Sequence, residues 1–409
     1  MKKVVIVDDD PGMLEFASFI LGRVYEVQTA PDGVAGLELI EKVRPDLVLL
    51  DLLMPRMHGF EVCRKIRENP ALKHIKVLIS SSKSYMHDIH TAKEAGADDY
   101  LVKPYETAAL LWKVEELIGE VKTPLTLKFW GTRGSLPSPG PATARYGGNT
   151  PCTELRVGET VIIVDAGSGL RELGLSLMKE FKDKPLDAHL FVGHTHWDHI
   201  QGFPFFVPAY LPNNKINVYG VHGTTQGFSD ILAGQMAPNY FPVAMKEMAA
   251  RIRVNELSGV SNLGPVKVTY HYLNHPGITI GFRFESKNWT VSYISDHEPY
   301  QKLNNKGEFS DKEDAAIARF VEGSDLLISE AQYTGDEYKY KKSWGHSTFQ
   351  DVLDLASKAK VKQLALFHHD PTHNDELMDK YVAESEEYLA KHAQGIKVFG
   401  AMEGMTLNF

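Results

Sequence analysis

The chain has 409 residues, of which 43% are hydrophobic, 10% aromatic and 24% charged, and this composition excludes a disordered or fibrous protein. At about 100–200 residues per domain, this length predicts two or three domains, and no apolar run approaches the roughly 20 residues that would span a bilayer. The 44 basic and 53 acidic residues give a net charge of −9, which disfavours a protein that coats nucleic acid but still allows a local basic groove.

The cysteines and histidines indicate where the chemistry lies. Cys63 and Cys152 are too few for a disulfide scaffold, and the opening MKKVVIVDDD lacks the apolar stretch of about 7–15 residues of a secretory signal, so we expect a cytoplasmic protein without a membrane segment. Of the 17 histidines, 13 follow residue 123. Because histidine is the commonest metal ligand and proton-transfer group, we expect a site in the second part of the chain.

The first 120 residues alternate short apolar runs with amphipathic stretches. This alternation predicts a doubly wound α/β domain, in which five parallel strands form a sheet with helices on both faces. The predicted strands are 4–7, 25–30, 46–50, 76–80 and 99–103, and the predicted helices are 14–21, 35–42, 59–68, 85–95 and 107–118. Ligands of such sheets bind beyond the carboxyl ends of the strands.

Pro124 predicts the end of this domain, with a linker over 121–125 and a second domain over 126–409. Long runs of strands with helices between and after them predict two packed sheets flanked by helices. The predicted strands are 125–131, 153–157, 160–164, 188–193, 216–220, 266–273, 279–285, 290–295, 325–329 and 363–367, and the predicted helices are 169–182, 225–235, 311–322, 346–359 and 373–391. The Met-rich segment 236–250 is interpreted as a loop that covers the core, with a substrate lid as the less favoured alternative.

Acidic and basic side chains follow several strands of the first domain. Asp8 and Asp9 follow the first strand, Asp51 the third and Lys103 the fifth. Because parallel strands end at the same edge of a sheet, these groups are expected to converge, and clustered carboxylates suit Mg²⁺. A carboxylate beside Mg²⁺ can act as nucleophile toward a phosphoryl group. Asp10, which precedes a proline, is interpreted as a helix cap.

The first 120 residues resemble a response-regulator receiver domain through the segments VVIVDDDP, PDLVLLDLLMPRMHGFE, VLISSSKS and GADDYLVKP. The resemblance implies a sensor histidine kinase as partner. It also implies family roles for six residues: Asp51 as phosphoacceptor, Asp8 and Asp9 as Mg²⁺ ligands together with Asp51, Ser81 as switch hydroxyl, Tyr100 as rotating aromatic and Lys103 as ligand of the phosphoryl oxygen. A serine stands where threonine is common in the family, and Ser80 or Ser82 could take the place of Ser81.

Four metal-ligand side chains occur within six residues after an apolar strand, as His194, His196, Asp198 and His199. On an extended segment His194 and His196 point to one side, and a following helical turn lets Asp198 and His199 reach a second point. Imidazole and carboxylate together suit zinc, with iron or manganese as chemical alternatives. Buried together without a metal, these polar groups would be costly.

Further ligands follow later strands, namely His275, Asp296 and the doublet His368–His369. The second domain resembles the αββα metallo-β-lactamase fold of metallohydrolases, and HTHWDH is the most specific motif of the resemblance. It implies two metals, one held by His194, His196 and His275 and the other by Asp198, His199 and His368, with Asp296 as the bridge. His368 fits the position directly after its strand better than His369, but the doublet leaves the choice open.

Other motifs resemble one branch of that fold, tRNA 3′-processing ribonuclease Z and its phosphodiesterase relatives. These are WGTRGSLP (130–137), RYGGNTPC (145–152), VDAGSGLR (164–171), SEAQY (329–333), SWGHST (343–348) and LALFHHDP (364–371). The resemblance implies that His346 lies near the scissile phosphate as general acid or phosphate ligand, oriented by Glu330. The structural alternative for His346 is a residue at a helix N-terminus. No separate basic arm is recognised, which, with the net charge of −9, counts against tRNA as substrate.

Together these patterns predict a two-component response regulator with a dinuclear-metal hydrolase output, a phosphodiesterase controlled by phosphorylation of Asp51. Two metals about 3.5–4 Å apart would ionise water, with Asp198 and His346 as catalytic residues. Asp165 and Asn149 are expected to be structural supports. The alternatives are a lactone or thioester hydrolase on the same fold and a non-catalytic signalling module. The expected substrate is a small phosphodiester or nucleotide, and a homodimer is compatible with this class of regulator.

Overall fold

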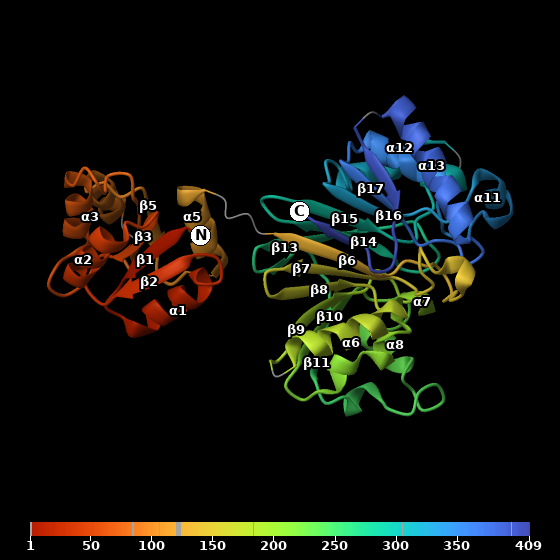
Figure 1. The fold of residues 1–409 in the computed structure, drawn as a ribbon, viewed down its shortest axis with the longest axis horizontal. Coiled ribbons are helices and arrows are strands. Elements are labelled where there is room, and N and C mark those ends of the chain that lie inside the picture. Colours follow the sequence, from red (N-terminus) through yellow and green to blue (C-terminus); the bar gives the residue numbers. More distant parts are fainter. Residues whose placement is uncertain are drawn as a thin grey trace. The chain divides into compact units, whose positions relative to one another are not determined.

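The apolar segments of the first unit form a parallel sheet that helices cover on both faces (Figure 1). The strand order is β2-β1-β3-β4-β5, and all neighbouring strands are parallel. Runs of Val, Ile and Leu suit these strands because both faces of the sheet are buried. The elements are β1 (Lys3–Val7), α1 (Pro11–Leu21), β2 (Glu26–Ala30), α2 (Gly33–Val43), β3 (Leu47–Asp51), α3 (Gly59–Glu68), β4 (Lys76–Ser81), α4 (Met86–Glu94), β5 (Asp99–Val102) and α5 (Thr107–Ile118).

This computed structural model describes residues 2–83, 86–105, 107–119, 124–182, 184–304, 306–393 and 395–409. The chain divides into two units, Met1–Thr123 and Pro124–Phe409. The linker predicted over 121–125 lies mostly outside the described residues, and Leu125 already belongs to the first strand of the second unit.

Every strand and helix predicted for the first unit is present, and α1 shows the largest shift of an end. It begins at Pro11 because the Asp10 side chain accepts a hydrogen bond of 2.8 Å from the backbone N–H of Gly12. Asp10 is therefore the helix cap that the sequence predicts.

Two seven-stranded sheets pack face to face in the second unit. Phe129, Ile162 and Phe191 of the first sheet meet Phe282 and Ile328 of the second in the core between them. Helices α6 and α8 cover the outer face of the first sheet, and α12 and α13 cover that of the second (Figure 1). This arrangement is the αββα sandwich that the sequence predicts.

The strand order of the first sheet is β11-β10-β9-β8-β7-β6-β19 and that of the second is β12-β13-β14-β15-β16-β17-β18. The first sheet consists of β6 (Leu125–Gly131), β7 (Cys152–Val157), β8 (Thr160–Val164), β9 (Asp187–Phe191), β10 (Lys215–Gly220), β11 (Arg251–Glu256) and β19 (Thr406–Asn408). The second consists of β12 (Ser261–Leu263), β13 (Val266–Tyr272), β14 (Ile280–Glu285), β15 (Thr290–Ile294), β16 (Leu326–Glu330), β17 (Gln363–Phe367) and β18 (Lys397–Gly400).

The helices of this unit are α6 (Gly169–Phe181), α7 (Trp197–Ile200), α8 (Phe228–Gly234), α9 (Tyr300–Asn304), α10 (Glu308–Phe320), α11 (Gly335–Lys341), α12 (Phe349–Lys358) and α13 (Asp375–His392). Short 3₁₀ helices are η1 (Pro141–Thr143), η2 (Phe203–Phe205), η3 (Val207–Tyr210) and η4 (Met245–Glu247). The sequence patterns do not predict β11, β12, β18, β19, α9 or α11. None of the described helices has the length and apolar character to cross a membrane.

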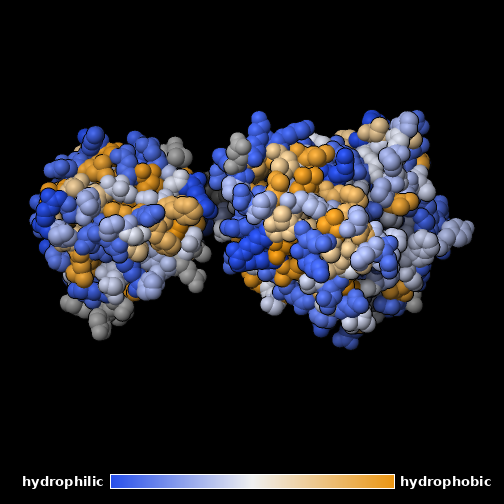
Figure 2. Space-filling model, turned by 90° about the horizontal axis from the view of Figure 1, so that it is seen from below, coloured by the Kyte–Doolittle hydropathy of each residue, from blue (hydrophilic) through white to orange (hydrophobic). Residues whose placement is uncertain are grey.

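The Met-rich segment 236–250 covers the core, which is the favoured interpretation of its sequence. Met236, Met248 and Ala250 are buried in the cluster between the first sheet and its helices. On the face shown in Figure 2, hydrophobic residues of the second unit gather in patches that hydrophilic residues border.

Candidate metal centre

The ends of four strands in the second unit deliver the predicted metal ligands to one place. The chain after β9 carries His194 and His196, and the short helix α7 that follows carries Asp198 and His199. His275 follows β13, Asp296 follows β15 and His368 follows β17. The structure brings all seven side chains together in overlapping groups whose ligand atoms lie within 4.8 Å of one another.

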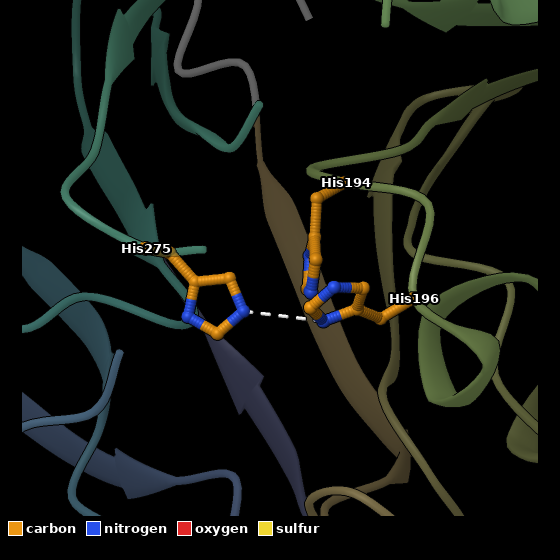
Figure 3. Close-up of side chains that lie close together, drawn as sticks. All are labelled: His194, His196 and His275. Atoms are coloured by element: carbon orange, nitrogen blue, oxygen red, sulfur yellow. Dashed lines mark hydrogen bonds between the residues drawn. The ribbon is translucent and has the colours of Figure 1, made fainter. Parts of the chain in front are cut away.

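Three histidines form the first group, and Figure 3 shows their rings turned toward one another. The Nδ1–H of His275 donates to the carbonyl oxygen of Gly345 at 2.9 Å, which leaves the lone pair on Nε2, and Nε2 lies 3.2 Å from Nδ1 of His196. His194 is buried, and neither of its ring nitrogens has a hydrogen-bond partner in the described part of the chain. Converging nitrogens of this kind fit a bound cation.

Two further histidines meet in the second group. The Nδ1–H of His199 donates to Asp165 Oδ2 at 2.8 Å, and that of His368 donates to Gln332 Oε1 at 2.9 Å. The two Nε2 atoms face each other at 3.3 Å, and Asp198 Oδ2 lies close to both. A cation between them would take the place of any ring proton, so the donor set fits a metal here as well.

Asp296 lies between the two groups. Its Oδ2 is 3.3 Å from Nε2 of His194 and 2.9 Å from Nε2 of His199, and its Oδ1 is 3.1 Å from Nε2 of His368. Asp198 Oδ2 lies 3.2 Å from His199 Nε2 and 3.1 Å from His368 Nε2, and its carboxylate also forms a candidate ligand group with His194 and His199. Asp296 and His368 both have positive φ angles, 51° and 54°, which is strain of a kind that concentrates at functional sites.

The protonation of the ligands also suits a metal. Burial lowers the pKa of His194 far below its usual value and that of His275 to about 4, so both imidazoles are neutral near pH 7. Burial alone would raise the pKa of Asp296, but the neighbouring histidines hold it well below its usual range. Burial opposes the charge of His199, but the carboxylates around it raise its pKa well above its usual value. A metal would therefore displace a proton there to reach the neutral imidazoles and ionised carboxylates that bind zinc and similar divalent ions.

His346 lies beside this cluster in a cavity of about 440 Å³, which Ser135, Trp197 and Asp198 also line. Its Nδ1 lies 3.3 Å from Asp296 Oδ1 and 3.8 Å from Glu330 Oε1. Burial works to lower the pKa of His346, but the charge of Glu330 and other carboxylates raises it above its usual value.

The orientation of His346 by Glu330 stays a prediction, because the 3.8 Å between His346 Nδ1 and Glu330 Oε1 is too long for a hydrogen bond. Glu330 Oε1 accepts hydrogen bonds from the backbone N–H groups of His297 at 3.0 Å and Ser347 at 2.7 Å. It therefore fixes the loop on either side of the site, and Asp296 is the closer partner of His346.

The structure places His369 away from the cluster, where its Nε2 donates to the carbonyl oxygen of Ala401 at 2.8 Å and its ring packs edge-on against Tyr146. Of the doublet, His368 alone joins the metal-ligand groups among the described residues.

The carboxyl ends of the strands in the first unit hold a second polar site. Lys103 Nζ lies 2.6 Å from Asp8 Oδ2 and 2.8 Å from Asp51 Oδ1, and Asp51 Oδ2 accepts the N–H of Leu53 at 2.6 Å. Burial raises the pKa of Asp8. Burial opposes the charge of Lys103, but the hydrogen bonds to both carboxylates raise its pKa. Asp9 is exposed at the same strand end.

The serines at the end of strand β4, which neighbours β3, lie in two environments. The Ser81 hydroxyl accepts the backbone N–H of Lys83 at 3.3 Å, and the Tyr100 hydroxyl donates to the carbonyl oxygen of the same residue at 2.8 Å. The Ser80 hydroxyl instead donates to Tyr105 at 3.3 Å. Ser81 is thus the serine that lies beside the predicted rotating aromatic, and Ser82 is exposed.

Comparison with known families agrees with both sites. A family model described as the beta-lactamase superfamily domain matches residues 160–369. The chain belongs to the beta-lactamase superfamily. A second model, the response regulator receiver domain, matches residues 4–115, so the first unit of this superfamily member is a receiver domain.

Individual relatives cover parts of the chain. The DNA-binding dual master transcriptional regulator RpaA of Synechocystis sp. is 36% identical over 119 residues, which are 29% of this chain and 49% of that protein. The chain thus spans about half the length of this curated relative. The metallo-beta-lactamase fold protein YhfI from Bacillus subtilis is 19% identical with a TM-score of 0.49, covering 70% of this chain and 100% of its own. A diphosphatase from the PhnP family is 18% identical, also with a TM-score of 0.49, covering 70% and 98%.

Sequence analysis missed several partners of the superfamily ligands. Gln332 orients His368, and the backbone N–H of Ser135, which has a φ of 61°, donates to Asp198 Oδ2 at 2.8 Å. Both residues lie inside motifs that the sequence analysis singles out, SEAQY and WGTRGSLP, which is the signal that could have found them. Asp165, which the sequence analysis expects to be a structural support, hydrogen-bonds directly to His199.

Proposed function

We propose that the chain is a response regulator whose second domain is a metal-dependent phosphodiesterase, controlled by phosphorylation of Asp51. The observation that carries the proposal is the position of His346. Its ring lies 3.3 Å from the carboxylate that joins both ligand groups, and it lines a cavity together with the ligands His196 and Asp198. A proton donor at the edge of a metal-ligand cluster is what cleavage of a phosphodiester requires.

In this proposal His194, His196 and His275 hold one metal and Asp198, His199 and His368 the other, with Asp296 shared. Zinc, iron or manganese bound there would ionise water and offset the charge of the phosphoryl oxygens.

The remaining chemistry belongs to side chains of the pocket. Asp198 faces the cavity, and the N–H of Ser135 at 2.8 Å fixes the carboxylate, which lets Asp198 orient the attacking water. His346 protonates the leaving oxygen, because the carboxylates around it favour its charged form. A cavity of about 440 Å³ suits a small phosphodiester or nucleotide rather than a folded macromolecule.

Control by the receiver domain rests on the pair of contacts that Lys103 makes. Phosphorylation by a sensor histidine kinase would give Asp51 about −1.5 to −2 charges. A Mg²⁺ held by Asp8 and Asp9 would neutralise part of that charge, and Lys103 would move from the carboxylates to the phosphoryl oxygens. Ser81 and Tyr100, whose hydroxyls both hydrogen-bond to the backbone of Lys83, would then carry the change to the surface of the domain.

The first prediction tests the catalytic proposal with the zinc-loaded chain and bis-p-nitrophenyl phosphate. His346→Ala should lower kcat by about 10²–10⁴-fold, the usual contribution of a general acid, with unchanged metal content. His222→Ala, at an exposed histidine, is the control and should keep full activity.

A panel of lactones and thioesters assayed in parallel separates the alternative hydrolase. Faster turnover of those esters than of the phosphodiester, or full activity of His346→Ala, would refute the phosphodiesterase. Acetyl phosphate as phosphodonor should change the rate of the wild-type chain.

A further inference from the structure

Two tryptophans of the second unit are exposed near the metal-ligand cluster. Trp197 is 81% exposed and Trp344 is 60% exposed, whereas Trp289 of the same unit is buried in the core. A large apolar ring that stays in water does not contribute the stabilisation that its burial would give. Two such rings near the same cluster therefore indicate a binding surface.

Trp197 lies within the ligand motif itself, between His196 and Asp198, and lines the same cavity as they do. Its carbonyl oxygen accepts the N–H of Gln201 at 2.8 Å in the short helix α7. The backbone of Trp197 is therefore fixed by its ligand neighbours, and its ring projects from the rim of the cavity.

The loop that carries Trp344 is fixed by hydrogen bonds to a buried carboxylate. Glu298 accepts the backbone N–H groups of Ser343 and Gly345, the two neighbours of Trp344, at 3.0 Å each. The carbonyl oxygen of Gly345 in turn accepts the hydrogen bond from the ligand His275. A buried carboxylate thus holds an exposed ring next to a metal ligand, although the ring itself is not packed into the core.

We propose that Trp197 and Trp344 form an aromatic platform that stacks a planar ring of the substrate, and that the pocket selects phosphodiesters that carry a nucleobase. The inference rests on the proposed function for the position of the phosphate at the ligand cluster. A nucleobase fits better than a lipid or a protein partner, because Trp197 lines a polar cavity together with Ser135, His346 and carboxylates, and Trp344 precedes His346 by two positions in the chain.

The test compares two ligands that share ribose and phosphate and differ by the base. Calorimetric titration of the zinc-loaded full-length chain with adenosine 5′-monophosphate and with ribose 5-phosphate gives both affinities without turnover. Stacking of one base predicts that the nucleotide binds about 10-fold more tightly. Trp197→Ala and Trp344→Ala should each reduce this preference and leave the affinity for ribose 5-phosphate unchanged, and Trp197→Phe and Trp344→Phe should retain most of it.

Trp112→Ala is the matched control, since Trp112 is 51% exposed on α5 of the receiver domain, and it should leave both affinities unchanged. Equal affinity of the wild-type chain for the two ligands would overturn the platform even if the chain hydrolyses phosphodiesters. An equal loss of both ligands in the alanine variants would also overturn it, because it indicates a structural role. A retained preference in a chain without hydrolytic activity would support the platform while refuting the proposed reaction.

Discussion

Asp165 is a fully buried residue that positions one of the candidate metal ligands, His199. Its carboxylate accepts hydrogen bonds from His199 Nδ1 at 2.8 Å, from the Tyr293 hydroxyl at 2.6 Å and from the N–H of Gly193 at 2.8 Å. These contacts fix the ring of His199 with its Nε2 lone pair toward the metal position. Asp165 has a φ of 63°, a conformation that Asp and Asn adopt more readily than other side chains.

The second prediction follows for Asp165→Asn, which keeps the shape and the backbone conformation but removes the charge. Loss of a carboxylate partner of a metal-bound histidine typically lowers metal affinity by about 10–100-fold, and we expect that range here. Competition for zinc with a chromophoric chelator measures it. Asp187→Asn, which makes the same change at an exposed carboxylate, provides a comparison that should retain zinc, and unchanged affinity in Asp165→Asn would refute the role of the carboxylate.

The third prediction concerns the two thiols. Burial raises the pKa of Cys63 to about 11 and that of Cys152 well above its usual value. The thiolate is the reactive form, so neither thiol should react with a disulfide reagent at pH 7.5. The same raised pKa values mean that the free energy of unfolding linked to these thiols should fall only above about pH 9. The native chain should release almost no thionitrobenzoate, and the denatured chain about two equivalents. Rapid labelling of the native chain would contradict the buried positions.

The cluster of candidate ligands could be predicted from the sequence, whereas the exact hydrogen bonds that orient them could not. His194, His275 and Asp296 follow apolar strands, and the edge of a sheet brings strand ends together whatever the exact packing. Gln332 reaches His368 from 36 positions away, and such a pairing depends on tertiary geometry that no local pattern records. The doublet at 368–369 is a similar case, because a single residue step decides which ring enters the site.

At the scale of secondary structure, exposure explains which elements the sequence predicted. The central strands are continuous apolar runs, but β11 reads RIRVNE at the edge of its sheet with mostly exposed or half-buried residues. The strand β19 has three residues and pairs with β6 from the other end of the domain. Edge strands of this kind are stabilised by pairing with a neighbouring strand and not by a hydrophobic pattern in their own sequence. A search for apolar runs therefore does not find them.

The loop before α12 gives the fourth prediction. Gly345 has a φ of 89°, and a Cβ atom there would overlap Nδ1 of the ligand His275. Gly345→Ala should therefore displace His275 and lower zinc content, in addition to a backbone cost of about 1–2 kcal/mol. Gly323→Ala is the matched control, since its φ is 66° and no atom lies within 4 Å of the added Cβ.

Zinc analysis and urea unfolding of the two glycine variants separate these effects. Both variants should lose similar stability when metal-free, and Gly345→Ala alone should lose zinc. Equal zinc content in the two variants would show that the position of His275 does not depend on this loop.

At the scale of the molecule, the chain combines two cores and two polar sites. The receiver domain packs its own apolar clusters on either side of the five-stranded sheet, around Val48 and Leu50 on one face and Leu47 and Leu49 on the other. The second domain has separate clusters between and outside its two sheets. The proposed phosphate site at Asp51 and the proposed metal site at Asp296 therefore rest on separate cores, and the proposed regulation requires the surfaces of the domains.

The fifth prediction tests this independence with Asp51→Asn. The amide cannot accept a phosphoryl group, but its single oxygen can still accept from Lys103 or from the N–H of Leu53, and Lys103 keeps its ion pair with Asp8, so the receiver domain should remain folded. We expect no labelling by radioactive acetyl phosphate, unchanged zinc content and unchanged basal hydrolysis, with loss of any response of the rate to acetyl phosphate. Loss of zinc in this variant would refute separate sites, and a retained response would show that control does not pass through Asp51.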